Sequence, residues 1–144
     1  MDGVAGSLRI QVQSIPIKIP EEVNPALAQI MRLRPGALIV LPSQLVIPHI
    51  VRIADIAVTH CLPTISALKG FAERGLLLSY GADVRDLERQ VAVYVDRIFK
   101  GAPPADLPVE RPTKFELTVN MKTAKALQLT IPQSLLLRAD ERIE

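Results

Sequence analysis

The chain has 144 residues, of which 49% are hydrophobic and 22% are charged, and its formal net charge is +2. This length and composition are typical of one globular domain and exclude a disordered chain. Basic and acidic residues are interspersed and only 3% of residues are aromatic, so we expect no nucleic-acid partner. The single cysteine excludes an internal disulfide.

Targeting signals are absent from the sequence as written. The N-terminus lacks a basic start followed by an apolar segment and a small-residue cleavage site. No apolar run reaches the roughly 18 residues that a membrane-spanning helix needs. On these grounds alone we expect a chain that stays in the cytoplasm where it is made.

The first elements are predicted from periodicity. Residues 8–15 alternate between apolar and polar side chains, which predicts a half-buried strand. A helix is expected after Glu21, with Leu27, Ile30 and Met31 on one face, and it ends before Pro35. The five apolar residues 37–41 then predict a strand covered on both faces.

The middle of the chain continues this alternation of strand and helix. Residues 48–60 predict a helix with its apolar stripe at Ile50, Val51, Ala54, Ala57 and Val58. A short strand over 62–66 and a short helix over 67–74 follow, and Gly75 ends that helix. Residues 76–79 predict a buried strand that ends at Tyr80-Gly81.

The clearest predicted helix covers residues 84–100. Asp83 stands at its N-cap and Gly101 at its C-terminal end, and two prolines after Gly101 prevent its continuation. Its apolar stripe consists of Val84, Leu87, Val91, Tyr94, Val95 and Ile98.

A proline-rich connector over 101–112 leads to a predicted strand over 114–119. Asn120 is expected to cap a helix over 121–127, and Ser134 is expected to cap another near the end. Strands that alternate with helices indicate an α/β fold with a mostly parallel sheet and helices on both faces.

Motifs for catalysis, cofactors and metals are absent. The chain contains no G-x-G-x-x-G, no G-x-x-x-x-G-K-[ST] and no G-x-S-x-G. His60 and Cys61 are adjacent on the predicted helix, which is poor geometry for joint metal ligation, and Cys61 is expected to pack as a small core residue. The acidic residues Asp83, Asp86 and Glu88 fit the first turns of a helix. We therefore expect no catalytic residue, no metal and no cofactor.

Small polar residues follow the predicted strands of the sheet. In an open parallel sheet, ligands bind beyond the carboxyl ends of the strands. Hydroxyls and free backbone N–H groups at those ends suit a small anionic or zwitterionic ligand. The candidate ligand-binding residues are Ser43, Thr64, Ser66, Ser79 and Tyr80. The alternative is that they only shape turns and cap helices.

Several segments also carry a resemblance to a known family. They are ALIVLP (37–42), HCLPTI (60–65), GLLLSYG (75–81), YVDRIFKGAPPADLPVE (94–110), PTKFEL (112–117) and NMKTAKAL (120–127). With these segments in this order, the chain resembles the tryptophan/tyrosine-type ABC transporter substrate-binding proteins. The resemblance is specific from about residue 37 to the end, and segment 100–127 is its most diagnostic part.

The resemblance implies a type I periplasmic-binding-protein fold, in which two α/β lobes close on a ligand. Residues 1–79 would belong to the C-terminal lobe, 80–107 would cross to a first lobe and pack on it, and 108–144 would return. The implied partners are a small molecule, such as an amino acid or related metabolite, and a membrane permease of an ABC importer. The implied location is the periplasm or cell surface.

The chain departs from the family pattern in three places. Family members are about twice as long, Arg74 stands where a glycine is common, and Gln128 stands where glycine often ends a helix. We therefore expect a shortened member that lacks most of the first lobe, with the apolar stripe of helix 84–100 unpartnered. An alternative is a one-lobe sensor or interaction domain that acts through a partner protein or a homodimer at Val84–Lys100. An enzyme on a flavodoxin-like sheet is disfavoured by the missing motifs.

Overall fold

The computed structural model describes residues 2–144, and the chain divides into two compact units, Met1–Arg34 and Pro35–Glu144. The first unit contains α1 (Asp2–Ser7), a 3-10 turn η1 (Pro20–Glu22) and α2 (Val23–Leu33). The predicted helix after Glu21 is confirmed. It ends at Arg34, whose φ of 48° is left-handed, and Pro35 follows, which disfavours helical backbone before it.

The strand predicted over residues 8–15 is wrong. These residues have no regular structure, and Leu8, Ile10 and Val12 are exposed. Alternation describes only how side chains would face, whereas a strand also needs a neighbour for its N–H and C=O groups. The amide of Ile10 instead donates to the carbonyl of Ala5 and closes the end of α1.

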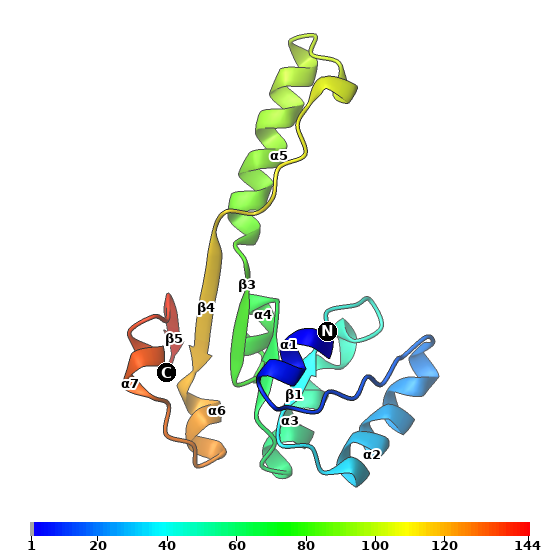
Figure 1. Ribbon diagram of the computed structural model, residues 1–144, viewed down its shortest axis with the longest axis vertical. Helices are drawn as coiled ribbons and strands as arrows, with labels where there is room; N and C mark the ends of the chain where they lie inside the picture. The colour runs from blue at the N-terminus through cyan, green and yellow to red at the C-terminus, as the bar shows by residue number, and fades with distance from the viewer. Residues whose placement is uncertain (1) are drawn as a thin grey trace. The chain divides into compact units, whose positions relative to one another are not determined.

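The second unit is built on a five-stranded mixed sheet (Figure 1). Its strands lie in chain order: β1 (Leu38–Val40), β2 (Thr64–Ser66), β3 (Leu78–Ala82), β4 (Phe115–Asn120) and β5 (Glu141–Ile143). β1, β2 and β3 are parallel, β4 is antiparallel to β3, and β5 is parallel to β4. The predicted α/β class with a mostly parallel sheet is confirmed.

Short helices connect the strands. A 3-10 turn η2 (Ile47–His49) and α3 (Ile50–Thr59) join β1 to β2, and α4 (Lys69–Glu73) joins β2 to β3. After β4 come α6 (Met121–Ala126) and α7 (Gln133–Leu136). The part of the core around α6 consists of Leu77, Ala124 and Leu127, against which Val58, Leu78 and Ile131 pack.

Side chains on one sheet face lie under α4. Val40, Ser66, Ser79, Thr118 and Glu141 are register partners across the five strands, so they share this face. Lys69 of α4 forms ion pairs with Glu116 and Glu141, which lie on the same face because residues 116 and 118 of a strand point the same way. This face is therefore polar where α4 covers it.

Asn120 joins β4, α4 and α6. Its side-chain oxygen accepts a hydrogen bond from the amide of Thr123, at 3.0 Å, and so caps α6 as predicted. Its side-chain nitrogen donates to the carbonyl of Ala72 in α4 at 2.9 Å. At the other end of α6, Gln128 has a left-handed φ of 56°, the conformation that glycine adopts most readily.

Other predictions need correction. Ile39 in β1 is exposed, so that strand is not covered on both faces, and on α3 Val51 is exposed while Ile53 is buried. β3 does not end at Tyr80-Gly81 but continues to Ala82, because β4 pairs with it along its whole length. Ser134 lies inside α7, whose N-cap is Pro132.

Two elements were not predicted at all, α1 and β5. β5 reads Glu-Arg-Ile and shows no apolar pattern. It is a strand because it pairs with β4, from Thr118↔Glu141 to Asn120↔Ile143, and nothing in its own sequence indicates this.

The longest helix, α5 (Val84–Phe99), lies between β3 and β4 in the chain. Figure 1 shows it leaving the end of β3, with the chain returning beside it to β4. The return segment contains a 3-10 turn η3 (Pro104–Asp106), and the Tyr94 hydroxyl donates to the carbonyl of Pro108 at 2.7 Å. The predicted cap is confirmed, because Asp83 accepts from the amide of Asp86. No residue of α5 is buried.

Candidate functional site

The carboxyl ends of β1, β2 and β3 are the expected place for a ligand in such a sheet. Ser43 lies beyond the end of β1 and is exposed. Its hydroxyl accepts a weak hydrogen bond from the amide of Val46 at 3.3 Å, which orders the turn before α3. Among the five predicted residues, Ser43 thus keeps an accessible hydroxyl at this edge.

Two predicted hydroxyls on β2 are buried and bind backbone. Thr64 is 3% exposed, and its hydroxyl accepts from the amide of Leu77 at 2.9 Å. Ser66 is also 3% exposed, and its hydroxyl lies 3.5 Å from the amide of Leu68. In this arrangement both side chains hold the loops around α4 in place and are closed to solvent.

Ser79 and Thr118 form a buried pair of hydroxyls. They are register partners on β3 and β4, and they are 1% and 0% exposed. Neither side-chain oxygen has a hydrogen-bond partner among the residues that the structure describes. Thr118 was not predicted as a candidate. Its place directly opposite Ser79 follows only from the pairing of β3 with β4.

Tyr80 points to the other face of the sheet, because neighbouring residues on a strand face opposite ways. Its ring stacks on that of Phe115, with the ring centroids 5.8 Å apart and an interplanar angle of 24°. The two side chains are 56% and 48% exposed. Phe115 was not predicted as a candidate, and only the antiparallel register of β3 with β4 brings it beside Tyr80. We call these two residues the aromatic pair.

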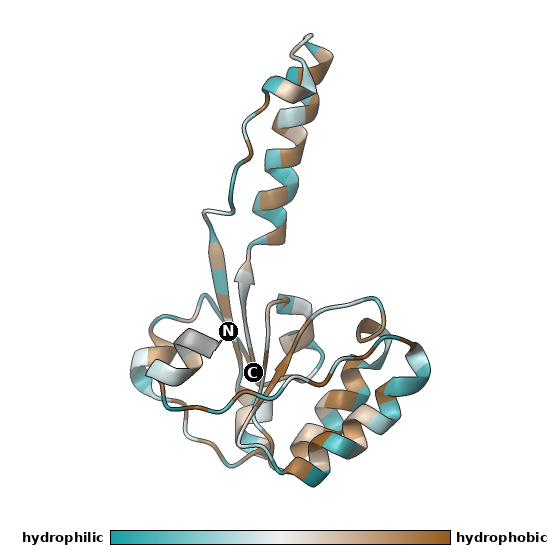
Figure 2. Cartoon of the chain, turned by 45° about the vertical axis from the view of Figure 1, so that its right-hand side comes forward, coloured by the Kyte–Doolittle hydropathy of each residue, from teal (hydrophilic) through white to brown (hydrophobic). Residues whose placement is uncertain are grey.

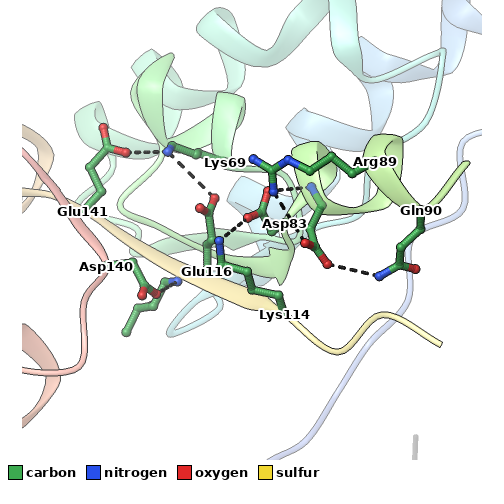
Figure 3. Close-up of polar contacts among 10 residues, drawn as sticks. Lys69, Asp83, Arg89, Gln90, Lys114, Glu116, Asp140 and Glu141 are labelled. Carbon is green, nitrogen blue, oxygen red and sulfur yellow. Dashed lines mark hydrogen bonds and ion pairs between the residues drawn. The ribbon is translucent and has the colours of Figure 1, made fainter. Parts of the chain in front are cut away.

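A charged cluster lies on the α4 side of the sheet (Figure 3). Lys69 lies between Glu116 of β4, at 3.8 Å, and Glu141 of β5. The hydrogen bond to Glu141 is the main cause of a raised Lys69 pKa, and burial opposes it. One lysine thereby ties α4 to two strands.

Asp83 is the buried acid of this region, with 4% of its surface exposed. Its carboxylate contacts the Lys114 ammonium at 2.7 Å and caps α5 through the amide of Asp86 at 3.2 Å. The Lys114 ammonium is the main cause of a lowered Asp83 pKa, with the α5 amides adding to it. The same ion pair raises the pKa of Lys114. The pair joins the two chain segments at the base of α5, one leaving the sheet and one returning.

A cavity of about 410 Å³ opens beside this cluster, between α4, the start of α5 and β4. Its volume lies in the range of small-molecule sites. None of Ser43, Thr64, Ser66, Ser79 and Tyr80 lines it. Its walls combine the apolar side chains of Ile47, Leu68 and Phe71 with several charged groups. Sequence reasoning predicted a short helix over 67–74 but did not single out its charged residues, which meet those of β4 only in the folded chain.

Within residues 2–144 no group of three or more His, Cys, Asp or Glu side chains is placed to hold a metal ion. The predicted core packing of Cys61 is wrong, because this residue is exposed. It has a left-handed φ of 52° just after His60, the C-cap of α3, so its side chain turns away from the core.

No helix in the described part of the chain combines the length and apolar character that crossing a bilayer requires.

Three solved structures are similar to this chain. A conserved domain protein from Vibrio cholerae is 26% identical, with a TM-score of 0.88 and 98% of this chain covered. The ABC domain from Streptococcus pneumoniae in complex with L-Trp is 23% identical, with a TM-score of 0.89 and 98% covered. A ligand-free, open substrate binding protein with adhesive properties from Clostridium difficile is 22% identical, with a TM-score of 0.70 and 99% covered.

The chain spans about half the length of these proteins, matching 47%, 48% and 48% of them. A search of curated proteins found no match. The model of one protein family, described as ABC transporter substrate binding protein, matches residues 3–143. This match covers nearly the whole chain, including the mixed sheet and α5, and it shows that the chain belongs to the ABC transporter substrate binding protein family.

Proposed function

We propose that this chain supplies one lobe and the crossing helix of a two-lobed solute-binding protein of an ABC importer. The observation that carries the proposal is the path of the chain between β3 and β4. The chain leaves the sheet on one strand, forms a 16-residue helix with no buried residue, and returns on the neighbouring strand. A helix that buries no side chain against its own domain is expected to pack on another domain.

The apolar stripe of α5 supports this assignment. Val84, Val91, Val95 and Ile98 are 40–60% exposed. Full burial of one such side chain is worth roughly 1.5–3 kcal/mol. Hydrophobic and hydrophilic residues alternate along α5 (Figure 2), as on a helix that covers a core with one face. In the proposal, residues 80–107 contact the first lobe, and 1–79 with 108–144 form the second.

The proposed ligand site is the carboxyl edge of β1–β3 that faces the crossing segment. The aromatic pair offers a flat, half-exposed apolar surface there, and Ser43 offers a hydroxyl. Such a surface suits the side chain of an aromatic amino acid, because offset stacking adds to area burial, and a branched aliphatic side chain would gain the area burial alone. The Streptococcus pneumoniae neighbour, solved in complex with L-Trp, supports this class of ligand.

The remaining parts of the proposal follow from the family. The bound solute would be delivered to a membrane permease, and the protein would act in the periplasm or at the cell surface without catalysing a reaction. A single lobe encloses less of a ligand than the 70–90% that small-molecule sites usually bury. We therefore expect weak binding by the chain alone.

Isothermal titration calorimetry of the chain with L-Trp, L-Tyr and L-Leu tests the ligand site. We expect saturable binding with one site per chain and a loss of about 2- to 13-fold in Tyr80→Ala, since stacking contributes roughly 0.5–1.5 kcal/mol. Phe99→Ala is the matched control, because Phe99 is an exposed aromatic on α5. Equal affinities for the parent chain and Tyr80→Ala would refute the aromatic pair as the site.

The stripe of α5 also favours the second candidate, an interaction domain that dimerises through Val84–Lys100. Sedimentation equilibrium distinguishes the two functions. A monomer at micromolar concentration supports the two-lobed assignment. A dimer that Val91→Lys dissociates supports the interaction domain instead.

A further inference from the structure

The cavity between α4 and the base of α5 is lined by charged residues, and only some of them form ion pairs. Six charged residues line it: Lys69, Glu73, Arg74, Asp83, Arg85 and Glu116. Three are basic and three are acidic, so their sum is zero. The charge of the ligand that fits therefore depends on which of these residues already form an ion pair.

Three lysine–carboxylate contacts occur in this region (Figure 3). Lys69 contacts Glu116 of the cavity wall and also Glu141 outside it. Asp83 contacts Lys114, which lies outside the cavity. The acids Asp83 and Glu116 therefore each face a lysine and are poor partners for an incoming cation.

Arg74 and Arg85 are the cavity's remaining cations. Neither guanidinium has an ion pair or a side-chain hydrogen bond with any other residue that the structure describes. Glu73 is the remaining acid, so two unpaired arginines stand against one unpaired carboxylate. Arginine presents a planar set of N–H donors that matches a carboxylate or phosphate with two parallel hydrogen bonds.

The cavity also has an apolar wall. Ile47 and Leu68 are half-buried and line the cavity, and Phe71, which is 3% exposed, adds only a small part of its surface to this wall. An inorganic anion would leave this wall wet, whereas an organic acid would cover it and add apolar burial to the charge pairing.

We propose that this cavity binds a small organic acid, with its acidic group at Arg74 and Arg85 and its apolar body against Ile47, Leu68 and Phe71. Neither Tyr80 nor Phe115 lines this cavity, so the two proposed sites use different residues. The proposal therefore does not depend on the amino-acid site proposed above.

The test uses the full chain with phenylacetate, with its uncharged isostere phenylacetamide, and with inorganic phosphate. Calorimetry should show saturable binding of phenylacetate and at least tenfold weaker binding of phenylacetamide. Phosphate should bind more weakly than phenylacetate. Equal affinity for phenylacetate and phenylacetamide, or phosphate binding without phenylacetate binding, would overturn the proposal.

Arg74→Gln and Arg85→Gln should each weaken phenylacetate binding at least fivefold. Arg97→Gln, which removes an exposed arginine near the other end of α5, should leave it unchanged. NMR chemical-shift mapping on the parent chain needs no variant to fold. Shifts at Arg74, Arg85 and Phe71 support the site, and shifts elsewhere with none at these residues contradict it.

Discussion

At the scale of single residues, Gly81 on β3 is a position with no room for a side chain. A Cβ added there would lie 1.9 Å from the carbonyl oxygen of Ala67 and 2.8 Å from its carbon. Both atoms belong to the backbone of the β2–α4 connection, so no side-chain rotation can relieve the clash. The absence of a side chain at Gly81 lets this connection lie against β3, beside the cavity.

Gly81→Ala should therefore destabilise the chain by about 1–3 kcal/mol, the range of overpacked sites. Urea denaturation followed by circular dichroism measures this change. Gly36→Ala is the matched control, because a Cβ at Gly36 meets nothing within 4 Å. A loss in Gly81→Ala no larger than in Gly36→Ala would mean that the β2–α4 connection yields freely.

A second prediction at this scale concerns Asp83 and the pH dependence of stability. The Lys114 ammonium lowers the pKa of this carboxyl below its ordinary 3.8, so the folded state favours the ionised form. The resulting stability is complete above the unfolded pKa and is lost as pH falls through the lower, folded pKa. Asp83→Asn keeps a good helix cap but removes the charge.

Denaturation midpoints measured from pH 7 to pH 2.5 should fall less in Asp83→Asn than in the parent chain below about pH 4, the ordinary range of a carboxyl. Asp106→Asn alters an exposed carboxylate without an ion pair among the described residues, and it should follow the parent curve. Parallel curves for Asp83→Asn and the parent would show that the Lys114 contact contributes no pH dependence.

At the scale of elements, the junction of β4, α4 and α6 depends on Asn120. This side chain is 4% exposed and makes two hydrogen bonds, to Thr123 and Ala72. Thr123 adds a third tie, donating from its hydroxyl to the carbonyl of Gly75 at 2.9 Å. The end of α4 is thus held to the junction of β4 and α6, which lies 48 residues further along the chain, by two polar side chains.

Asn120→Ala removes the cap of α6 and one of the two hydrogen bonds to the carbonyl of Ala72, which keeps its bond from the amide of Gly75. A lost cap costs about 1 kcal/mol and a lost hydrogen bond about 0.5–1.5 kcal/mol, so we expect a loss of roughly 1.5–2.5 kcal/mol in urea denaturation. Asn24→Ala, at an exposed position in α2, should change stability by less than about 0.5 kcal/mol. A small effect of Asn120→Ala would mean that water replaces both bonds.

At the scale of the whole molecule, α5 has an apolar stripe that stays exposed in this chain. Val91 on this helix is 60% exposed, whereas Val119 in the sheet is 0% exposed. If α5 has no partner in the isolated chain, Val91→Ser should cost under about 0.5 kcal/mol. Val119→Ala should cost about 2 kcal/mol, as expected of a truncation in the core.

Hydrogen exchange gives an independent measure of the same prediction. Amides of α5 should exchange faster than those of β3 and β4, because a helix held only at its base opens locally. Slow exchange along α5, together with a large cost of Val91→Ser, would show that its stripe is covered in solution by another copy of the chain.

The sequence by itself determined the elements that carry their own signals. The α2, α3 and α5 helices have apolar stripes with stop signals, Asp83 and Asn120 precede helices as caps, and the apolar runs mark β1 to β3. The α/β class follows from their alternation, and the family resemblance from the segments after residue 37. The helices, caps and strands among these features depend on interactions between residues close in sequence, so the local sequence determines them.

Tertiary structure decided what depends on pairing. Residues 8–15 alternate but find no strand to pair with, whereas the polar residues 141–143 become β5 because β4 supplies a neighbour. The register of β3 with β4 buries Ser79 against Thr118 and sets Tyr80 on Phe115. The cavity joins residues 47, 68–74, 82–85 and 116, and no local pattern indicates that they meet. Contacts between distant segments depend on the packing of the whole sheet, which local periodicity does not encode.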